Sequence, residues 1–164
     1  MTDHVGQIGI VHPLDESRLE KQFKIIDKLS EKLNIKIFKG AEIDILKNGR
    51  LALSRKMQNK LDIVLASIHS SFKMSEKDMT DRICNAFEKD RVHIFAHPTG
   101  RLLQQREAYA VNFDKLFNCA KHNNVFLEIN CHPERMDLNG ELIKTAKLAG
   151  CKFSMGTDSH NKES

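Results

Sequence analysis

The sequence predicts an α/β fold in which parallel strands alternate with helices to form an open sheet or a barrel. Short apolar runs rich in β-forming residues alternate with longer segments whose apolar residues recur at helical spacing. This order favours parallel strands, because a helix after each strand returns the chain to the same edge of the sheet. Four of the five predicted strands also deliver a residue of a metal-ligand type at their C-terminal end. Such ends converge on one face, where α/β enzymes place their chemistry.

Length and composition indicate one domain over residues 1–164 with an ordinary charge balance. The 26 basic and 22 acidic residues give a net charge of +4, which suits an anionic substrate and equally an ordinary solvated surface. No apolar stretch is long enough to cross a membrane, and the N-terminal residues lack a signal-peptide pattern. The four cysteines have no C-x-x-C spacing, so we expect reduced thiols in a cytoplasmic protein.

The first third of the chain predicts one long helix and one strand. Residues 1–13 are expected to be irregular, with at most a minor strand over residues 8–11. Asp15 is expected to cap a helix that runs to about Asn34. One apolar stripe marks the inner side of this helix: Leu19, Phe23, Ile26, Leu29 and Leu33.

A strand that begins at Lys36 and reaches Glu42 follows this helix. The chain continues through Ile43 to Leu46, and Asn48-Gly49 then predicts a tight β-hairpin. The next strand spans residues 62–69 and ends at a histidine.

The second half repeats the alternation of helix and strand. Ser75 is expected to cap a helix before the central strand, residues 91–97, which ends at His97 and breaks at Pro98 and Gly100. A polar loop over 101–110 precedes a third helix, marked by Phe113, Leu116, Phe117 and Ala120. The closing elements are a strand over 125–130, a helix from Asn139 to Gly150, and a strand that leads to Asp158 and His160.

The residues at the strand ends are those that bind divalent transition metals. Imidazole nitrogens and carboxylate oxygens bind zinc, manganese or iron well, and a carboxylate can bridge two ions. A single histidine at a strand end is more often structural, but the recurrence at four strand ends favours a shared metal site. The candidate ligands are His4, Glu42, His69, His97, Asp158 and His160.

Two arginines just past the central strand are candidates for holding a phosphate. Arg101 and Arg106 follow His97-Pro-Thr-Gly and could make bidentate hydrogen bonds to phosphate oxygens. A solvated basic loop is an equally good interpretation of both. Arg135 is open to the same two interpretations, and Glu128, within a strand, has no assigned role.

Several of these segments together resemble the polymerase and histidinol phosphatase (PHP) superfamily. The resemblance is greater to the C-terminal PHP domain of bacterial and archaeal family X DNA polymerases. It implies a distorted, TIM-like barrel of seven βα units with three metal ions, and phosphoester hydrolysis as the activity. The segments that carry it are Thr2-Asp-His4, Gly40-Ala-Glu42-Ile-Asp-Ile-Leu46, Ala66-Ser-Ile-His69-Ser70, Ala96-His97-Pro-Thr-Gly-Arg-Leu-Leu103, Glu128-Ile-Asn130 and Gly156-Thr-Asp158-Ser-His160.

The resemblance also implies a role for each candidate ligand. Glu42 would be the bridging carboxylate, and His69 and His97 would complete one metal centre with it. Asp158 would bind a second ion, and His4 with His160 would belong to a third. Water activated between zinc, manganese or iron ions would attack phosphorus, while Arg101 or Arg106 would orient the phosphate.

The chain departs from the family pattern at its start. The family begins with a strand bearing His-x-His, whereas this chain has no His-x-His and begins at Thr2-Asp-His4, which follows the second strand in the family. We therefore expect an incomplete barrel of about five parallel strands that lacks the first two and binds fewer ions. Two exposed sheet edges would follow, and a homodimer or higher oligomer that covers them.

Three functions remain open at this point. The first is a metal-dependent phosphoesterase that processes DNA, as a 3′–5′ exonuclease or a DNA end phosphatase, with impaired activity. The second is a non-enzymatic remnant or accessory module. The third is a small-molecule phosphatase of the histidinol phosphate type. A pure nucleic-acid-binding module is disfavoured, because no basic stripe carries stacking aromatic residues.

Overall fold

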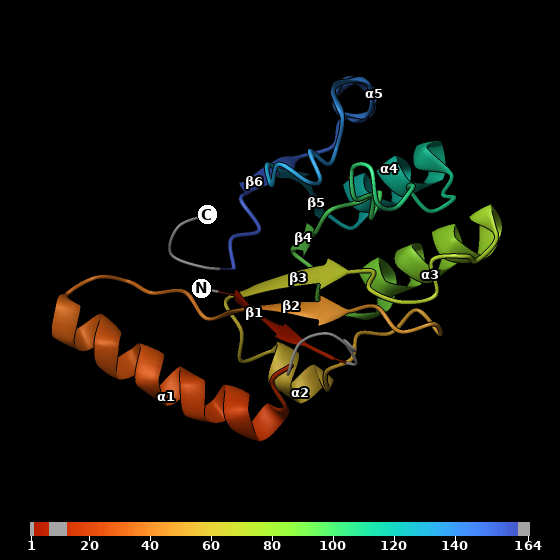
Figure 1. Cartoon of the computed structure of the whole chain (residues 1–164). Helices are drawn as coiled ribbons and strands as arrows, with labels where there is room; N and C mark the ends of the chain where they lie inside the picture. The colour runs from red at the N-terminus through yellow and green to blue at the C-terminus, as the bar shows by residue number, and fades with distance from the viewer. Residues whose placement is uncertain (1, 7–12, 161–164) are drawn as a thin grey trace.

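The computed structural model describes residues 2–6 and 13–160, which form one six-stranded sheet with helices along the chain between its strands (Figure 1). All five strand pairs are parallel, and the spatial order of the strands is their order in the sequence. The predicted α/β class is therefore confirmed, and the sheet is compatible with an incomplete TIM-like barrel. The strands are β1 (Thr2–Val5), β2 (Gly40–Asp44), β3 (Ile63–Ser67), β4 (Ile94–Phe95), β5 (Phe126–Asn130) and β6 (Phe153–Gly156).

The helices begin where the sequence places capping residues. Asp15, Ser75 and Asn139 each accept a hydrogen bond from a backbone N–H three residues on, as their side chains predict. The described helices are α1 (Glu16–Leu33), α2 (Arg55–Gln58), α3 (Glu76–Lys89), α4 (Phe113–His122) and α5 (Gly140–Ala149). The short helix α2 was not predicted, because four residues are too few to show a helical period.

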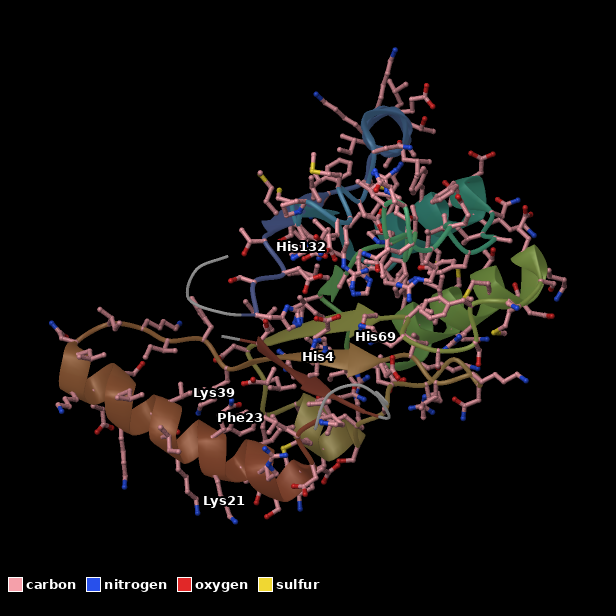
Figure 2. The ribbon with its side chains drawn as sticks, in the orientation of Figure 1. His4, Lys21, Phe23, Lys39, His69 and His132 are labelled. Carbon is pink, nitrogen blue, oxygen red and sulfur yellow. The ribbon has the colours of Figure 1, made fainter. Side chains whose placement is uncertain are left out.

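Alternation along the strands separates the core from the cavity. Successive side chains of a strand point to opposite faces. In β2, Ala41 and Ile43 are fully buried in the core, whereas Glu42 between them lines a cavity. On α1, Phe23 points toward the sheet and Lys21 away from it (Figure 2).

The sheet curves, so that its two edge strands approach each other at one end. The chain after β6 runs back toward β1 (Figure 1), and the Nε2 atoms of His160 and His4 lie 3.2 Å apart. Elements at opposite ends of the strand order thus contribute to the same site. The site needs this curvature, because a flat sheet would hold β1 and β6 several strand spacings apart.

Three sequence expectations differ from the structure. Thr2–Val5 is a sixth parallel strand, not an irregular segment; it was not predicted because its residues are mostly polar. The minor strand expected over 8–11 lies outside the described residues. The strand expected from Lys36 begins only at Gly40. The central strand is two residues long. The predicted hairpin at Asn48-Gly49 is present as a tight reversal, with one antiparallel bridge between Ile45 and Leu51.

No described helix combines the length and the apolar character that crossing a membrane requires.

Candidate metal centre

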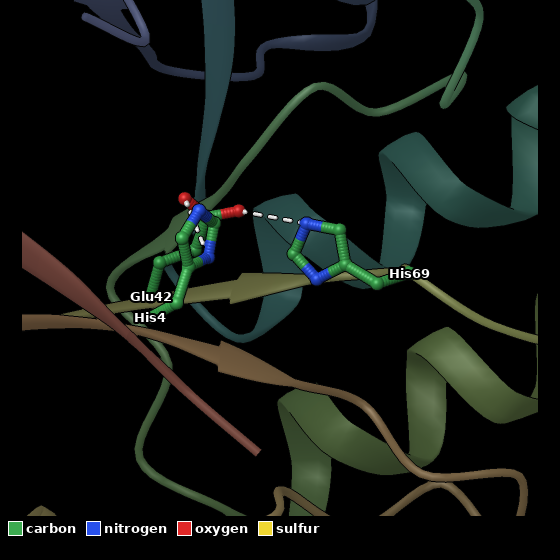
Figure 3. Close-up of side chains that lie close together, drawn as sticks. All are labelled: His4, Glu42 and His69. Carbon is green, nitrogen blue, oxygen red and sulfur yellow. Dashed lines mark ion pairs between the residues drawn. The ribbon is translucent and has the colours of Figure 1, made fainter. Parts of the chain in front are cut away.

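Glu42 lies at the centre of the site, with histidines near both of its carboxylate oxygens. Its Oε1 is 3.0 Å from Nε2 of His97 and 3.3 Å from Nε2 of His69. Its Oε2 is 3.8 Å from Nδ1 of His4. Figure 3 shows Glu42 between His4 and His69, whose donor atoms all lie within 4.8 Å of one another and of the carboxylate. One carboxylate therefore faces imidazoles on two sides, as a bridging ligand would.

Neighbouring strands bring these side chains together. His4 lies opposite Glu42 in the register of β1 and β2. His69 lies two residues after the end of β3, and His97 lies two residues after the end of β4. His97 is only 2% exposed and has a φ of 32°, in the left-handed region that residues other than glycine rarely adopt.

Asp158 and His160 complete the cluster from the other edge of the sheet. Oδ1 of Asp158 lies 3.7 Å from Nδ1 of His160, whose Nε2 faces His4. Asp158 also has a left-handed φ, of 52°. The structure thus brings all six candidate ligands into one cluster, although they lie on or just after five different strands spread over the chain.

The electrostatics favour an ionised carboxylate among the imidazoles. Burial would raise the pKa of Glu42, but hydrogen bonds from His69 and His97 outweigh it and hold that pKa well below its ordinary value. Burial would lower the pKa of His69, but Asp44 and Glu42 outweigh it and raise the pKa to about 9. Burial lowers the pKa of His4, and the nearby Glu42 opposes this only in part.

The donor set fits a divalent metal ion. The Nδ1 atoms of His4 and His97 are buried and have no hydrogen-bond partner among the described residues. The 3.2 Å between the Nε2 atoms of His4 and His160 is close to the separation, about 3.3 Å, of two nitrogens on a tetrahedral ion with bonds of about 2.05 Å. A divalent ion accounts for the converging imidazoles, because each ring can give it the one lone pair of its unprotonated nitrogen.

Asp44 orients His69, a role that the sequence did not reveal. It is 1% exposed, and its Oδ1 accepts hydrogen bonds from the main-chain N–H of His69 (3.1 Å) and from its Nδ1 (3.0 Å). The ring is therefore fixed with Nε2 facing Glu42. Metal-binding histidines commonly donate their second nitrogen to a carboxylate in this way. A carboxylate two residues after Glu42 was the only signal available in the sequence.

A cavity of about 500 Å³ adjoins the cluster, within the usual range for small-ligand sites. Its polar wall includes Glu42, His97, Glu128 and Asp158. Its apolar wall comes from β3 and β4 and from Met155 of β6. A phosphoester could therefore enter beside the candidate ligands.

The predicted phosphate-holding arginines lie apart from this cavity. Arg101 donates to the main-chain carbonyls of Arg135 and Met136. Arg106 donates to the carbonyl of Gly100 at 2.9 Å and lies 4.1 Å from the ring centroid of Phe72. Neither is among the residues that line the cavity. The guanidinium that reaches the cluster is that of Arg135, whose Nε is 2.8 Å from Oδ2 of Asp158.

Comparison with known proteins finds relatives over most of the chain. The DNA polymerase/3'-5' exonuclease PolX of Bacillus subtilis is 39% identical over 164 residues, which are 99% of this chain and 29% of that protein. A probable phosphatase of Clostridium acetobutylicum is 30% identical over 148 residues, 84% of this chain and 58% of that protein. A probable phosphatase of Thermoanaerobacter sp. is 32% identical over 143 residues, 80% of this chain and 56% of that protein.

No protein-family model matches the sequence. The chain spans less than a third of the polymerase and little more than half of each of these phosphatases.

Proposed function

Because this chain is a relative of the PHP superfamily, on the side of the family X DNA polymerases, we propose that it is a metal-dependent phosphoesterase. The observation that carries the proposal is Glu42, whose two carboxylate oxygens face His69 and His97 on one side and His4 on the other. Few arrangements other than a metal centre account for three imidazoles around one carboxylate with two buried ring nitrogens unpaired among the described residues.

The residues would divide the work between three groups. Glu42, His69 and His97 would hold one ion, Asp158 would bind a second, and His4 with His160 would belong to the site of a third. A bound divalent ion supplies a water of lowered pKa and draws electron density from a phosphoryl oxygen. Asp44 keeps His69 in one orientation, and the burial of His97, which is 2% exposed, limits its contact with bulk water.

For the substrate we favour the phosphodiester or phosphomonoester at the end of a DNA strand. PolX, named as a 3′–5′ exonuclease, is 39% identical over 99% of this chain. Arg101 and Arg106 remain our prediction for groups that hold the DNA phosphate, and they would have to leave their present carbonyl partners to do so. We expect lower activity than in a protein with the complete ligand set.

A small phosphomonoester is the second candidate substrate. The relatives named as probable phosphatases support it. The cavity of about 500 Å³ is also large enough for a small metabolite and too small for several nucleotides. A non-enzymatic module would retain the fold and the metal without turnover.

The test is hydrolysis by the purified chain with Mn²⁺ or Zn²⁺. The substrates are a 5′-labelled single-stranded DNA, the same DNA with a 3′-phosphate, and histidinol phosphate. We expect shortening of the first or release of phosphate from the second, at least 10²-fold slower in Glu42→Gln because that variant loses the central carboxylate. Glu141→Gln, on the exposed start of α5, is the matched control and should equal the wild type.

The outcomes separate the three functions. Cleavage of histidinol phosphate alone would replace the DNA proposal by the small-molecule one. No turnover of any substrate, with metal bound, would leave the non-enzymatic module. Turnover that survives in Glu42→Gln would contradict the proposed site.

We also propose that the chain works in the cytoplasm. Its four cysteines are all free thiols, as is usual in a reducing compartment. Retention of all four thiols after oxidant-free purification, counted by alkylation and mass spectrometry, is the expected result.

A further inference from the structure

Asn130, at the end of β5, lies between two groups of side chains, which we call the arms of the site. One arm is Glu128 with His97, and the other is Asp158. It is 1% exposed, and its Nδ2 is 3.1 Å from Oε2 of Glu128 and 3.1 Å from Oδ2 of Asp158. An amide nitrogen has two hydrogens, so it can donate one to each carboxylate. Its Oδ1 accepts from the main-chain N–H of His132 at 3.0 Å, which fixes the orientation of the amide.

Each carboxylate that Asn130 binds leads to a candidate ligand. Glu128 Oε2 also accepts the main-chain N–H of His97 at 2.8 Å, so this arm holds the backbone of His97. Asp158 is itself the other ligand, and Arg135 contacts the same Oδ2 from its Nε. Asn130 and Arg135 thus occupy Oδ2 and leave Oδ1 as the oxygen on the side of His160.

Both arms end at residues with left-handed backbones. His97 and Asp158 have φ values of 32° and 52°. Such conformations persist in residues other than glycine only where the surrounding contacts enforce them. The hydrogen bonds of Asn130 reach the side chain of one and, through Glu128, the backbone of the other. The close approach of Glu128 to Gly156 supports the same contact, because any side chain at Gly156 would displace the Glu128 carboxylate.

We propose that Asn130 is a positioning residue that sets Asp158 and His97 relative to each other, so that ions bind to both arms of the site together. It does so through one buried amide nitrogen shared by two carboxylates. The inference rests on the proposed metal centre, but it assigns a role to a residue that would not touch the metal or the substrate.

The test is a double-mutant cycle read by Mn²⁺ affinity. Calorimetric titrations are made on the wild-type chain, Asn130→Ala, Asp158→Ala and the double variant. Asn130→Ala should weaken Mn²⁺ binding at least tenfold, the usual effect of removing a group that orients a metal ligand. In the Asp158→Ala background the same change should weaken Mn²⁺ binding by less than threefold, because the Asp158 carboxylate that Asn130 positions is already absent.

The matched control is Asn123→Ala. Asn123 is the C-cap residue of α4, and its side-chain amide donates to the main-chain carbonyl of Cys119 at 2.9 Å. This substitution should leave Mn²⁺ binding unchanged. Thermal unfolding without metal, on the same four proteins, gives a second readout of the Asn130–Asp158 coupling. If Asn130→Ala does not fold, Asn130→Asp, which keeps the shape but removes the donor, takes its place in the cycle.

Three results are distinguishable. No Mn²⁺ binding by the wild type would overturn the proposed function and this inference with it. Binding by the wild type that Asn130→Ala leaves intact would overturn the inference alone. Losses that multiply in the double variant would also overturn it, because Asn130 and Asp158 would then act independently.

Discussion

His69 is held by two carboxylates, and this contact links the stability of the metal-free protein to pH. Asp44 and Glu42 raise its pKa from 6.5 to about 9 against the opposing effect of burial. A raised pKa means that the folded state binds the proton more tightly than the unfolded state does. The protonated ring therefore stabilises the metal-free fold below about pH 6.5, and this contribution is lost as the pH rises through about 9.

We predict that the melting temperature of the metal-free protein falls between pH 6.5 and pH 9.5. The free energy of unfolding should fall by on the order of 3 kcal/mol, since each pKa unit is worth about 1.4 kcal/mol. Asp44→Asn should have a smaller fall, because one of the two carboxylates is lost. Scanning calorimetry with a chelator present measures both. A melting temperature that is flat or rises over this interval would show that His69 is not protonated in this way.

At the same scale, the sequence predicted the candidate ligands but not the residues that contact and orient them. His4, Glu42, His69, His97, Asp158 and His160 could be found because they recur beside strand ends, and the structure places them together. Asp44, Glu128, Asn130 and Arg135 carry no such pattern, since their roles depend on which atoms a folded chain brings within 3 Å. Among these residues, Glu128 gave a signal in the sequence, because a carboxylate inside an apolar strand indicates a buried charge that needs partners.

Helix α1 lies where the sequence predicted a helix, but only part of its predicted apolar stripe is buried. Its cap at Asp15 and its buried residues Leu19, Phe23 and Ile26 agree with the predicted stripe. The last two residues of the stripe, Leu29 and Leu33, are 40% and 53% exposed. A hydrophobic period gives the direction of a helix face, but it does not give how far the sheet extends beneath it.

We predict that Leu19→Ala lowers the free energy of unfolding by 2–5 kcal/mol, because Leu19 is fully buried and its loss leaves a cavity. Ile25→Ala in the same helix, where Ile25 is 57% exposed, should change it by less than about 1 kcal/mol. Urea denaturation followed by circular dichroism measures both. Equal losses from the two substitutions would mean that α1 packs on another face than the one described.

At the scale of the whole molecule, the sheet has two edges. Within residues 2–6 and 13–160, β1 pairs only with β2, and β6 pairs only with β5. Met155 on β6 is 76% exposed, although it is a large apolar side chain in a strand. Unpaired strand edges beside apolar surface favour association with another chain.

We therefore predict a homodimer or higher oligomer at micromolar concentration. Sedimentation velocity should give a mass at least twice that of the 18.8 kDa chain. Met155→Lys, which places a charge at the β6 edge, should shift the equilibrium toward the monomer if that edge takes part. A single monomeric species over the whole concentration range would contradict the prediction.

At this scale the alternation of segments predicted the fold class, whereas the curvature of the sheet was implied only by the resemblance to a TIM-like barrel. Alternating β and α segments suffice to predict a parallel sheet. The return of the chain after β6 to β1, which puts His160 beside His4, depends on the twist summed over six strands. The sixth strand itself was missed, because Thr2–Val5 is short and mostly polar.

The central claim is that Glu42 and the histidines around it bind a divalent metal. Its most direct test is the metal content per chain, by elemental analysis after purification without a metal-affinity tag or chelator and after reloading with Mn²⁺ or Zn²⁺. We predict at least one tightly held ion per wild-type chain and a clear loss in Glu42→Gln, with Glu141→Gln unchanged. A wild-type chain that holds no ion after reloading would contradict the account.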